Sequence, residues 1–217
     1  MRFKLFLLIV VAVVSGAVLS GCSSKNKANE SGKTQIVNQA PDEDQKARLQ
    51  SRLNIRYSDP EAHFELAQIY RSQTLWDKAE KEYNLTLQFA PGHKNAQAAM
   101  TRMFLDKNDT DRSRLLADIY MNQAKPSAKA SMLLGKAFQN EGLDNYAFQC
   151  YDHAATLAPT SAELQRLIGY YYKRQGDKVR AGEAFKKSFQ LDPYNPDVSG
   201  ELGRMGVQVE VPRKQQK

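Results

Sequence analysis

A spacing of 34 residues recurs through most of this chain and limits what it can fold into. Three similar phrases end in proline: LTLQFAP at 85–91, AATLAP at 154–159 and KSFQLDP at 187–193. The last two prolines are 34 residues apart and the first two are 68 apart, which is two periods. A repeat of this length holds two short helices, and only stacked copies bury a continuous core. The period therefore predicts an array of helix pairs.

Matching columns emerge when the units are aligned on these prolines. The first helix of each unit carries a small residue followed by an aromatic one, at Ala67 and Tyr70, Gly135 and Phe138, and Gly169 and Tyr172. The second helix carries alanine and then an aromatic residue, at Ala79 and Tyr83, Ala147 and Tyr151, and Ala181 and Phe185. Small residues let two helices approach closely, and large residues one turn away fill the remaining space.

In these columns the chain resembles the tetratricopeptide-repeat family across roughly residues 60–206. The resemblance implies an all-α fold, a right-handed solenoid of about four helix-turn-helix repeats with an extra helix at each end. We place the domain at 42–206, with repeats at about 60–93, 94–127, 128–161 and 162–195 and a terminal helix at 196–206. Asp59 before Pro60, and Asn195 before Pro196, are typical helix-start signals.

The second repeat departs from the pattern. Its columns hold Thr101, Phe104, Ser113 and Ala117, and its proline, Pro126, falls one residue late. Because its length is preserved, we interpret it as a true repeat with a looser or bent interior. A docking place for a partner is the alternative interpretation of the same irregularity.

The N-terminal segment has the pattern of a secretory leader. Basic residues at Arg2 and Lys4 precede an apolar stretch from Leu5 to Leu19, which is short for a membrane span. The following Leu19-Ser20-Gly21-Cys22 resembles the bacterial lipobox, which implies cleavage before Cys22 and lipid on its thiol. We therefore expect a signal peptide at 1–21 and a flexible tether at 22–41; an uncleaved signal anchor is the alternative. Ser23 in place of aspartate favours the outer membrane in a cell with two membranes.

Composition and motifs argue against chemistry on this chain. The formal charge of +7 is spread along the sequence, and two cysteines do not make a disulfide framework, so we expect Cys150 to be a small buried residue. Three histidines lack metal-ligand spacing, and no phosphate loop or nucleophile motif is present. We expect no enzyme activity, no metal and no cofactor, and the export signal disfavours a nucleic-acid partner.

The resemblance implies that the first helices line a concave surface on which partners bind. Its inward positions correspond here to Gln68, Arg71, Arg102, Lys136, Asn140, Arg166, Tyr170, Lys173, Arg174 and Arg204, which we call the predicted groove residues. Few acidic residues interrupt this set, so the hypothesis is a basic groove for an acidic or extended peptide, with Tyr170 as an aromatic anchor. Ordinary solvated lysines and arginines are the alternative interpretation. The family's two-carboxylate clamp is not evident, because Phe64 and Gln68 stand at its positions.

Together these features predict a lipid-anchored scaffold on the periplasmic face of a cell envelope. Lipoproteins of this kind resemble factors that assist assembly of a pilus or secretion channel; the alternative is an adaptor or regulator of peptidoglycan-modifying enzymes. The tail at 207–217 alternates apolar and polar residues at Val207–Val211, and we expect it to pack over the last helix or to pair with a partner strand.

Overall fold

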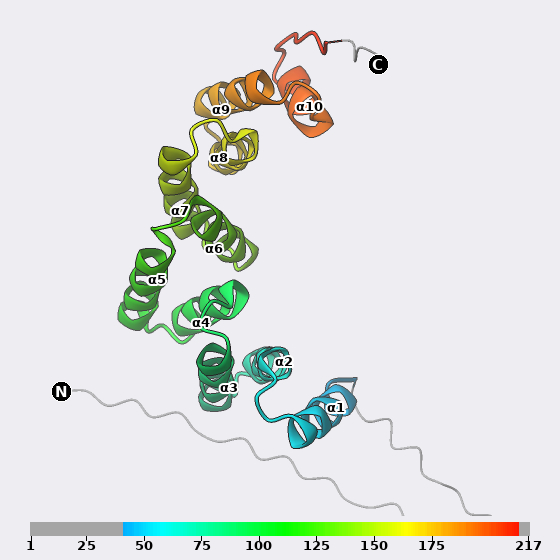
Figure 1. Ribbon diagram of the computed structural model, residues 1–217, viewed down its shortest axis with the longest axis vertical. Coiled ribbons are helices and arrows are strands. Elements are labelled where there is room, and N and C mark those ends of the chain that lie inside the picture. The colour runs from blue at the N-terminus through cyan, green and yellow to red at the C-terminus, as the bar shows by residue number, and fades with distance from the viewer. Residues whose placement is uncertain (1–40, 213–217) are drawn as a thin grey trace, which may run out of the picture. The chain divides into compact units, whose positions relative to one another are not determined.

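The computed structural model describes residues 41–212, which contain ten α-helices and no strand (Figure 1). The predicted signal peptide, Cys22 and almost all of the tether lie outside this range. Contacts between residues group 39–217 as one unit, and only this unit is described below. Among the described residues, no helix is both long enough and apolar enough to cross a membrane.

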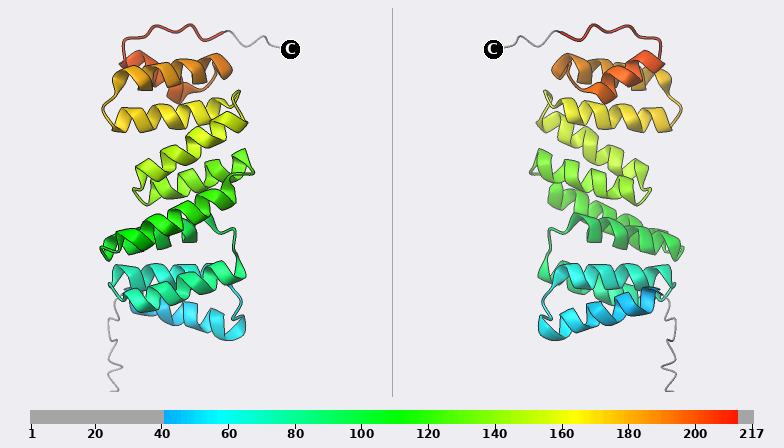
Figure 2. Two further views of the ribbon diagram at one scale, coloured as in Figure 1. Left: turned by 90° about the vertical axis from the view of Figure 1, so that its left-hand side faces the viewer. Right: turned by 90° about the vertical axis from the view of Figure 1, so that its right-hand side faces the viewer.

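Four helix pairs follow one another between an extra helix at each end (Figure 2). The first helices of the pairs are α2 (Pro60–Ser72), α4 (Lys94–Asp106), α6 (Ala128–Asn140) and α8 (Ala162–Arg174). The second helices are α3 (Trp76–Phe89), α5 (Thr110–Ala124), α7 (Asp144–Leu157) and α9 (Lys178–Leu191), and the extra helices are α1 (Pro41–Ile55) and α10 (Pro196–Arg204). The prediction of an all-helical array of about four repeats with extra helices at its ends is confirmed.

Every first helix begins with a capping side chain, which explains where the pairs start. The side chains of Asp59, His93, Ser127, Ser161 and Asn195 each accept a hydrogen bond from a backbone N–H in the first turn. These N–H groups have no partner within the helix, so a side-chain acceptor at this position stabilises the helix start. Proline follows directly after Asp59 and Asn195, where its missing N–H costs nothing.

Within a pair, the two helices touch where a small residue faces an aromatic ring. A methyl group built on Gly135 would lie 2.5 Å from the Tyr151 ring, and one built on Gly169 would lie 2.7 Å from the Phe185 ring. Both rings are completely buried. The close approach of α6 to α7 and of α8 to α9 therefore depends on glycine at these positions.

The second pair distributes its volume differently, which explains its irregular sequence. Thr101 takes the place of the small residue and Ala117 takes the place of the aromatic ring, and both are completely buried. The Ser113 hydroxyl also donates a hydrogen bond to the Thr101 carbonyl, at 3.0 Å. With no ring between them, α4 and α5 contact each other less extensively than the helices of the other pairs do.

The two ends of the array are covered in different ways. Helix α1 buries Leu49 and Leu53 against the first pair and leaves most of its other side chains in solvent. Helix α10 buries Val198 and Leu202 against α9. Val207 and Val209, beyond α10, pack partly against the same cluster, in agreement with the expectation that the tail packs back.

We predict that Gly135→Ala destabilises the fold by about 1–3 kcal/mol, because the new methyl group would overlap the immobile Tyr151 ring. The matched control is Gly203→Ala, which lies in the same column on α10 with nothing within 4 Å of the added methyl group. It should be neutral or stabilising by up to about 1 kcal/mol through helix propensity. Urea unfolding followed by circular dichroism measures both; equal stabilities would contradict the packing argument.

The cap at Asp59 predicts a dependence of stability on pH. Burial raises the pKa of this carboxyl, but the hydrogen bond from the Ala62 N–H and the charges of Arg52 and Arg56 outweigh it and leave the pKa below its ordinary value. A depressed pKa in the folded state contributes stability that is present above about pH 4 and is lost as the pH falls through the folded-state value.

The variant Asp59→Asn keeps a capping oxygen and removes the charge. We expect it to be less stable than the parent by about 1 kcal/mol at pH 7, with the difference vanishing near pH 2. Urea unfolding at both pH values measures this, and a difference that persists unchanged at pH 2 would show that the carboxylate charge is not involved.

Candidate partner-binding surface

The first helices lie side by side and carry all of the predicted groove residues. Helix α4 contacts both α2 and α6, so the surface runs across successive pairs. Gln68, Asn140, Lys173, Arg174 and Arg204 are exposed, whereas Arg71, Arg102, Lys136, Arg166 and Tyr170 are partly buried. All ten side chains are at least partly accessible; their role in binding stays a prediction.

Acidic residues interrupt this surface far more than the sequence suggested. Every arginine and lysine in the predicted set lies within 4.0 Å of a carboxylate: Arg71 and Arg102 meet Asp106, Lys136 meets Glu163, Arg166 meets Asp197, Arg174 meets Asp144, and Lys173 and Arg204 meet Glu201. The expectation of a basic set with few acidic neighbours is therefore wrong. The surface alternates in charge.

The strongest of these contacts link three successive pairs. Two guanidinium nitrogens of Arg71 on α2 reach Asp106 at the end of α4, at 3.0 Å, and Glu141 directly after α6, at 2.7 Å. Arg102 donates to the same Asp106 at 2.8 Å. Burial opposes the charge on Arg71, but the hydrogen bond and charge of Glu141 outweigh it, so the pKa of Arg71 is raised. These four residues form what we call the Arg71 network.

Some of these pairs have a periodic signal that sequence reasoning missed. The Lys136–Glu163 and Lys173–Glu201 pairs are separated by 27 and 28 residues, slightly less than one repeat. A basic residue late in one first helix therefore meets an acidic residue early in the next first helix. The 70-residue separation of Arg71 from Glu141 has no such signal, because the contact depends on how three pairs stack.

Apolar groups lie between the charges. The Tyr170 ring packs edge-on against Phe185, with centroids 5.1 Å apart, and Arg166 and Lys173 approach the Tyr170 ring to about 6 Å. Leu105 and Leu133, on α4 and α6, are 37% and 42% exposed, and the sequence analysis did not select them. Leu105 lies one 34-residue period after Arg71, so the repeat alignment could have identified it.

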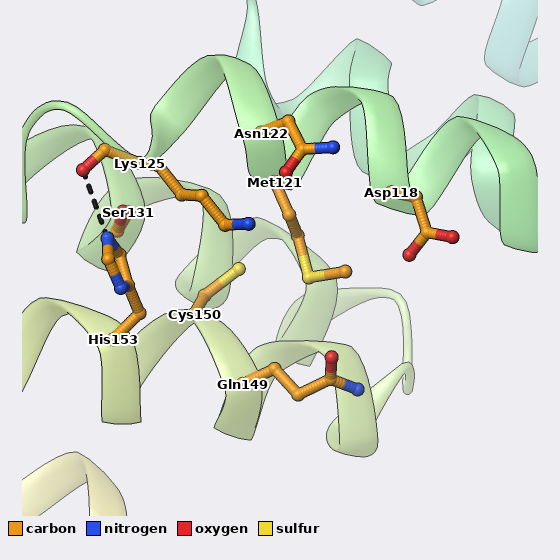
Figure 3. Close-up of a pocket in the computed structure, with 8 residues that line it drawn as sticks. All are labelled: Asp118, Met121, Asn122, Lys125, Ser131, Gln149, Cys150 and His153. Atoms are coloured by element: carbon orange, nitrogen blue, oxygen red, sulfur yellow. Dashed lines mark hydrogen bonds between the residues drawn. The ribbon is translucent and has the colours of Figure 1, made fainter.

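A separate hollow of about 390 Å³ opens between α5 and α7, with Ser131 of α6 at its edge (Figure 3). Cys150 lies in its wall and is only 3% exposed, which confirms the expectation of a small buried residue. Burial raises the pKa of its thiol to about 12, against the opposing charge of Lys94. The thiol is therefore protonated and unreactive at neutral pH.

The three histidines have separate structural surroundings. His63 is buried between Glu82 and the Tyr57 carbonyl, at 2.6 Å and 2.8 Å, and His93 caps α4. His153 faces the Lys125 carbonyl at 3.0 Å, as Figure 3 shows. Within residues 41–212, no three histidine, cysteine or acidic side chains are grouped so that they could hold a metal ion.

Comparison with known proteins agrees with this description. The family model of the tetratricopeptide repeat matches residues 162–195, which are α8, α9 and the turn after them. The BBSome complex member BBS4 homolog of Drosophila melanogaster is 25% identical over 136 residues. That alignment covers 62% of this chain and 28% of the relative, so this chain spans less than a third of that protein's length.

Several solved structures are similar at low identity. MamA is 18% identical over 67% of this chain and 80% of its own, with a TM-score of 0.41. PilF of Pseudomonas aeruginosa is 19% identical over 67% of each chain, with a TM-score of 0.41. YrrB, a repeat protein with an unusual peptide-binding site, is 13% identical over 75% of this chain and 84% of its own, with a TM-score of 0.41. Similarity at this level says nothing about what this chain binds.

The class of protein follows from the fold. Residues 162–195 match a tetratricopeptide repeat, and the pairs before them share its helix order and its column of small residues. The fold is thus a tetratricopeptide-type helical array, and such arrays are scaffolds whose extended faces bind protein or peptide partners.

The Arg71 network should couple the first three pairs. In a double-mutant cycle on Arg71→Met and Glu141→Gln, we expect a coupling energy of about 1–2 kcal/mol, because both side chains are only about 20% exposed. The control cycle on Lys46 and Glu43, an exposed pair within α1, should give about 0.5 kcal/mol or less. Equal couplings from urea unfolding would show that the network adds nothing to the stacking.

Proposed function

We propose that the protein is a scaffold, held at the membrane by lipid on Cys22 and facing the periplasm, that assists assembly of an envelope complex such as a pilus or secretion channel. It acts through the face of its first helices and catalyses no reaction. The observation that carries the proposal is the order of parts along the chain. A lipobox-like Leu19-Ser20-Gly21-Cys22 precedes a polar stretch and then an array whose first helices present one mixed surface.

The electrostatics of this surface refine the partner that we propose. A partner segment with only acidic side chains would have to compete with Asp106, Glu163 and Glu201 for basic groups that are already paired. An extended segment or helix that offers both charges, and an apolar side chain for Leu133 or Tyr170, avoids this competition. Charge then selects the register of the partner more than it adds affinity.

The anchor suits this role physically. A single acyl chain gives marginal membrane binding, and several chains give stable attachment. Attachment through a polar segment keeps the array close to the bilayer and raises the local concentration of envelope partners around it.

Site-specific photo-crosslinking in the native host tests the proposal. We expect a photoreactive residue at Tyr170 to capture an envelope protein, whereas one at the exposed Gln190 on α9 should not. Cys22→Ala should release the chain from membranes and greatly reduce the capture. Mass spectrometry of the N-terminal peptide should show acyl mass on Cys22 in the parent chain.

The identity of the captured protein decides the finer claim. A pilus or secretion-channel component supports the assembly role, and a peptidoglycan-modifying enzyme supports an adaptor role instead. Equal capture from Tyr170 and Gln190 would remove the first-helix face as the binding surface. An intact N-terminus without acyl mass would remove the lipid anchor.

A further inference from the structure

Helix α10 has the place of a first helix in a fifth repeat. It begins with Asn195 and Pro196, as α2 begins with Asp59 and Pro60, and it packs on α9 through Val198 and Leu202. No further helix follows it among the described residues, where 207–212 are not helical. The face on which a second helix would lie is therefore not covered by a helix of the described chain.

One column shows what this face is shaped to contact. Residues 67, 101, 135, 169 and 203 are each 34 apart, and the first four are buried beneath the second helix of their own pair. At Gly135 and Gly169 the covering group is an aromatic ring, from Tyr151 and Phe185 respectively. Gly203 is the fifth member of the column, but it is exposed and has nothing within 4 Å of its missing side chain.

A hollow lies in front of Gly203. Its volume is about 990 Å³, and Ser199, Gly203 and Gly206 line one side of it. The other side is the extended segment from Val207 to Val211, which leaves α10 at the end of the array (Figure 2). Val211 is 51% exposed. The hollow thus combines a floor without side chains and a wall of valines, which suits a flat apolar ring; we call it the α10 socket.

We propose that the α10 socket receives an aromatic side chain from an amphipathic helix of a partner protein, which packs antiparallel on α10 as α9 packs on α8. The socket continues the column of an existing interface, since Gly169 meets Phe185 one period earlier. The partner helix should resemble α9, with a small residue at the position of Ala181 and an aromatic residue four positions later. This surface is distinct from the first-helix face and adds a second attachment point to the proposed scaffold.

A peptide copied from α9 tests the socket directly. The probe is the 14-residue segment Lys178–Leu191, labelled with a fluorophore and stapled between positions 183 and 187, because an isolated helix of this length is marginal in water. Both stapled positions are exposed in the protein. Fluorescence anisotropy with the full chain should show saturable binding, and a peptide with Phe185→Ala should bind at least tenfold more weakly.

Variants of the protein locate the site. Gly203→Leu should fill the socket and weaken binding of the peptide at least tenfold, whereas Gly92→Leu, at a turn with open space around it, should leave it unchanged. Thermal unfolding checks that both variants fold. A photoreactive benzoyl group at position 185 of the peptide should crosslink to residues 199–211.

Two results would overturn the proposal. One is absence of binding at millimolar peptide, and the other is binding that Gly203→Leu does not change, which would mean that the peptide replaces the chain's own α9. In either case the small residues of α10 serve only to end the array with a solvated surface. The measurement is independent of the lipid on Cys22 and of crosslinking at Tyr170, so the proposed scaffold function and the socket succeed or fail separately.

Discussion

The close contact between a small residue on one helix and an aromatic ring on the next governs the rest of this structure. At Gly135 and Gly169 the partner ring lies so near that no side chain fits, and the distance between the two helices of a pair is set there. Once this distance is set in each pair, the first helices line up and the turns between helices fall at one period. The second pair tolerates a looser contact because Thr101 and Ala117 divide the volume in another way.

The charges on the first helices are a consequence of that stacking. Side chains that would be solvated on an isolated helix pair reach carboxylates on the neighbouring unit, and Arg71 contacts groups from two further pairs. Pairs that are mostly exposed add little stability, whereas the partly buried Arg71 network can hold three pairs in one arrangement. The same pairing removes most of the attraction for a purely acidic ligand, so shape and apolar contact become more important for recognition.

The two ends of the array solve one problem in different ways. A repeat leaves an apolar face wherever the stacking stops, and a polar outer helix is the usual cover. Helix α1 provides such a cover at one end. At the other end α10 reduces the exposed face to Ser199, Gly203 and Gly206, which lowers the cost of exposure but also leaves room for another helix.

Much of this protein can be deduced from the amino-acid sequence alone. The 34-residue period, the small and aromatic columns and the capping residues are local or strictly periodic, and they determine the number, order and starting points of the helices. The leader and the lipobox at Cys22 are likewise legible only in the sequence. The tertiary structure alone decided that the predicted basic groove is charge-compensated and that Gly203 faces an open hollow. Those properties depend on side chains 27 to 70 residues apart, which meet, or fail to meet, only after the pairs have stacked.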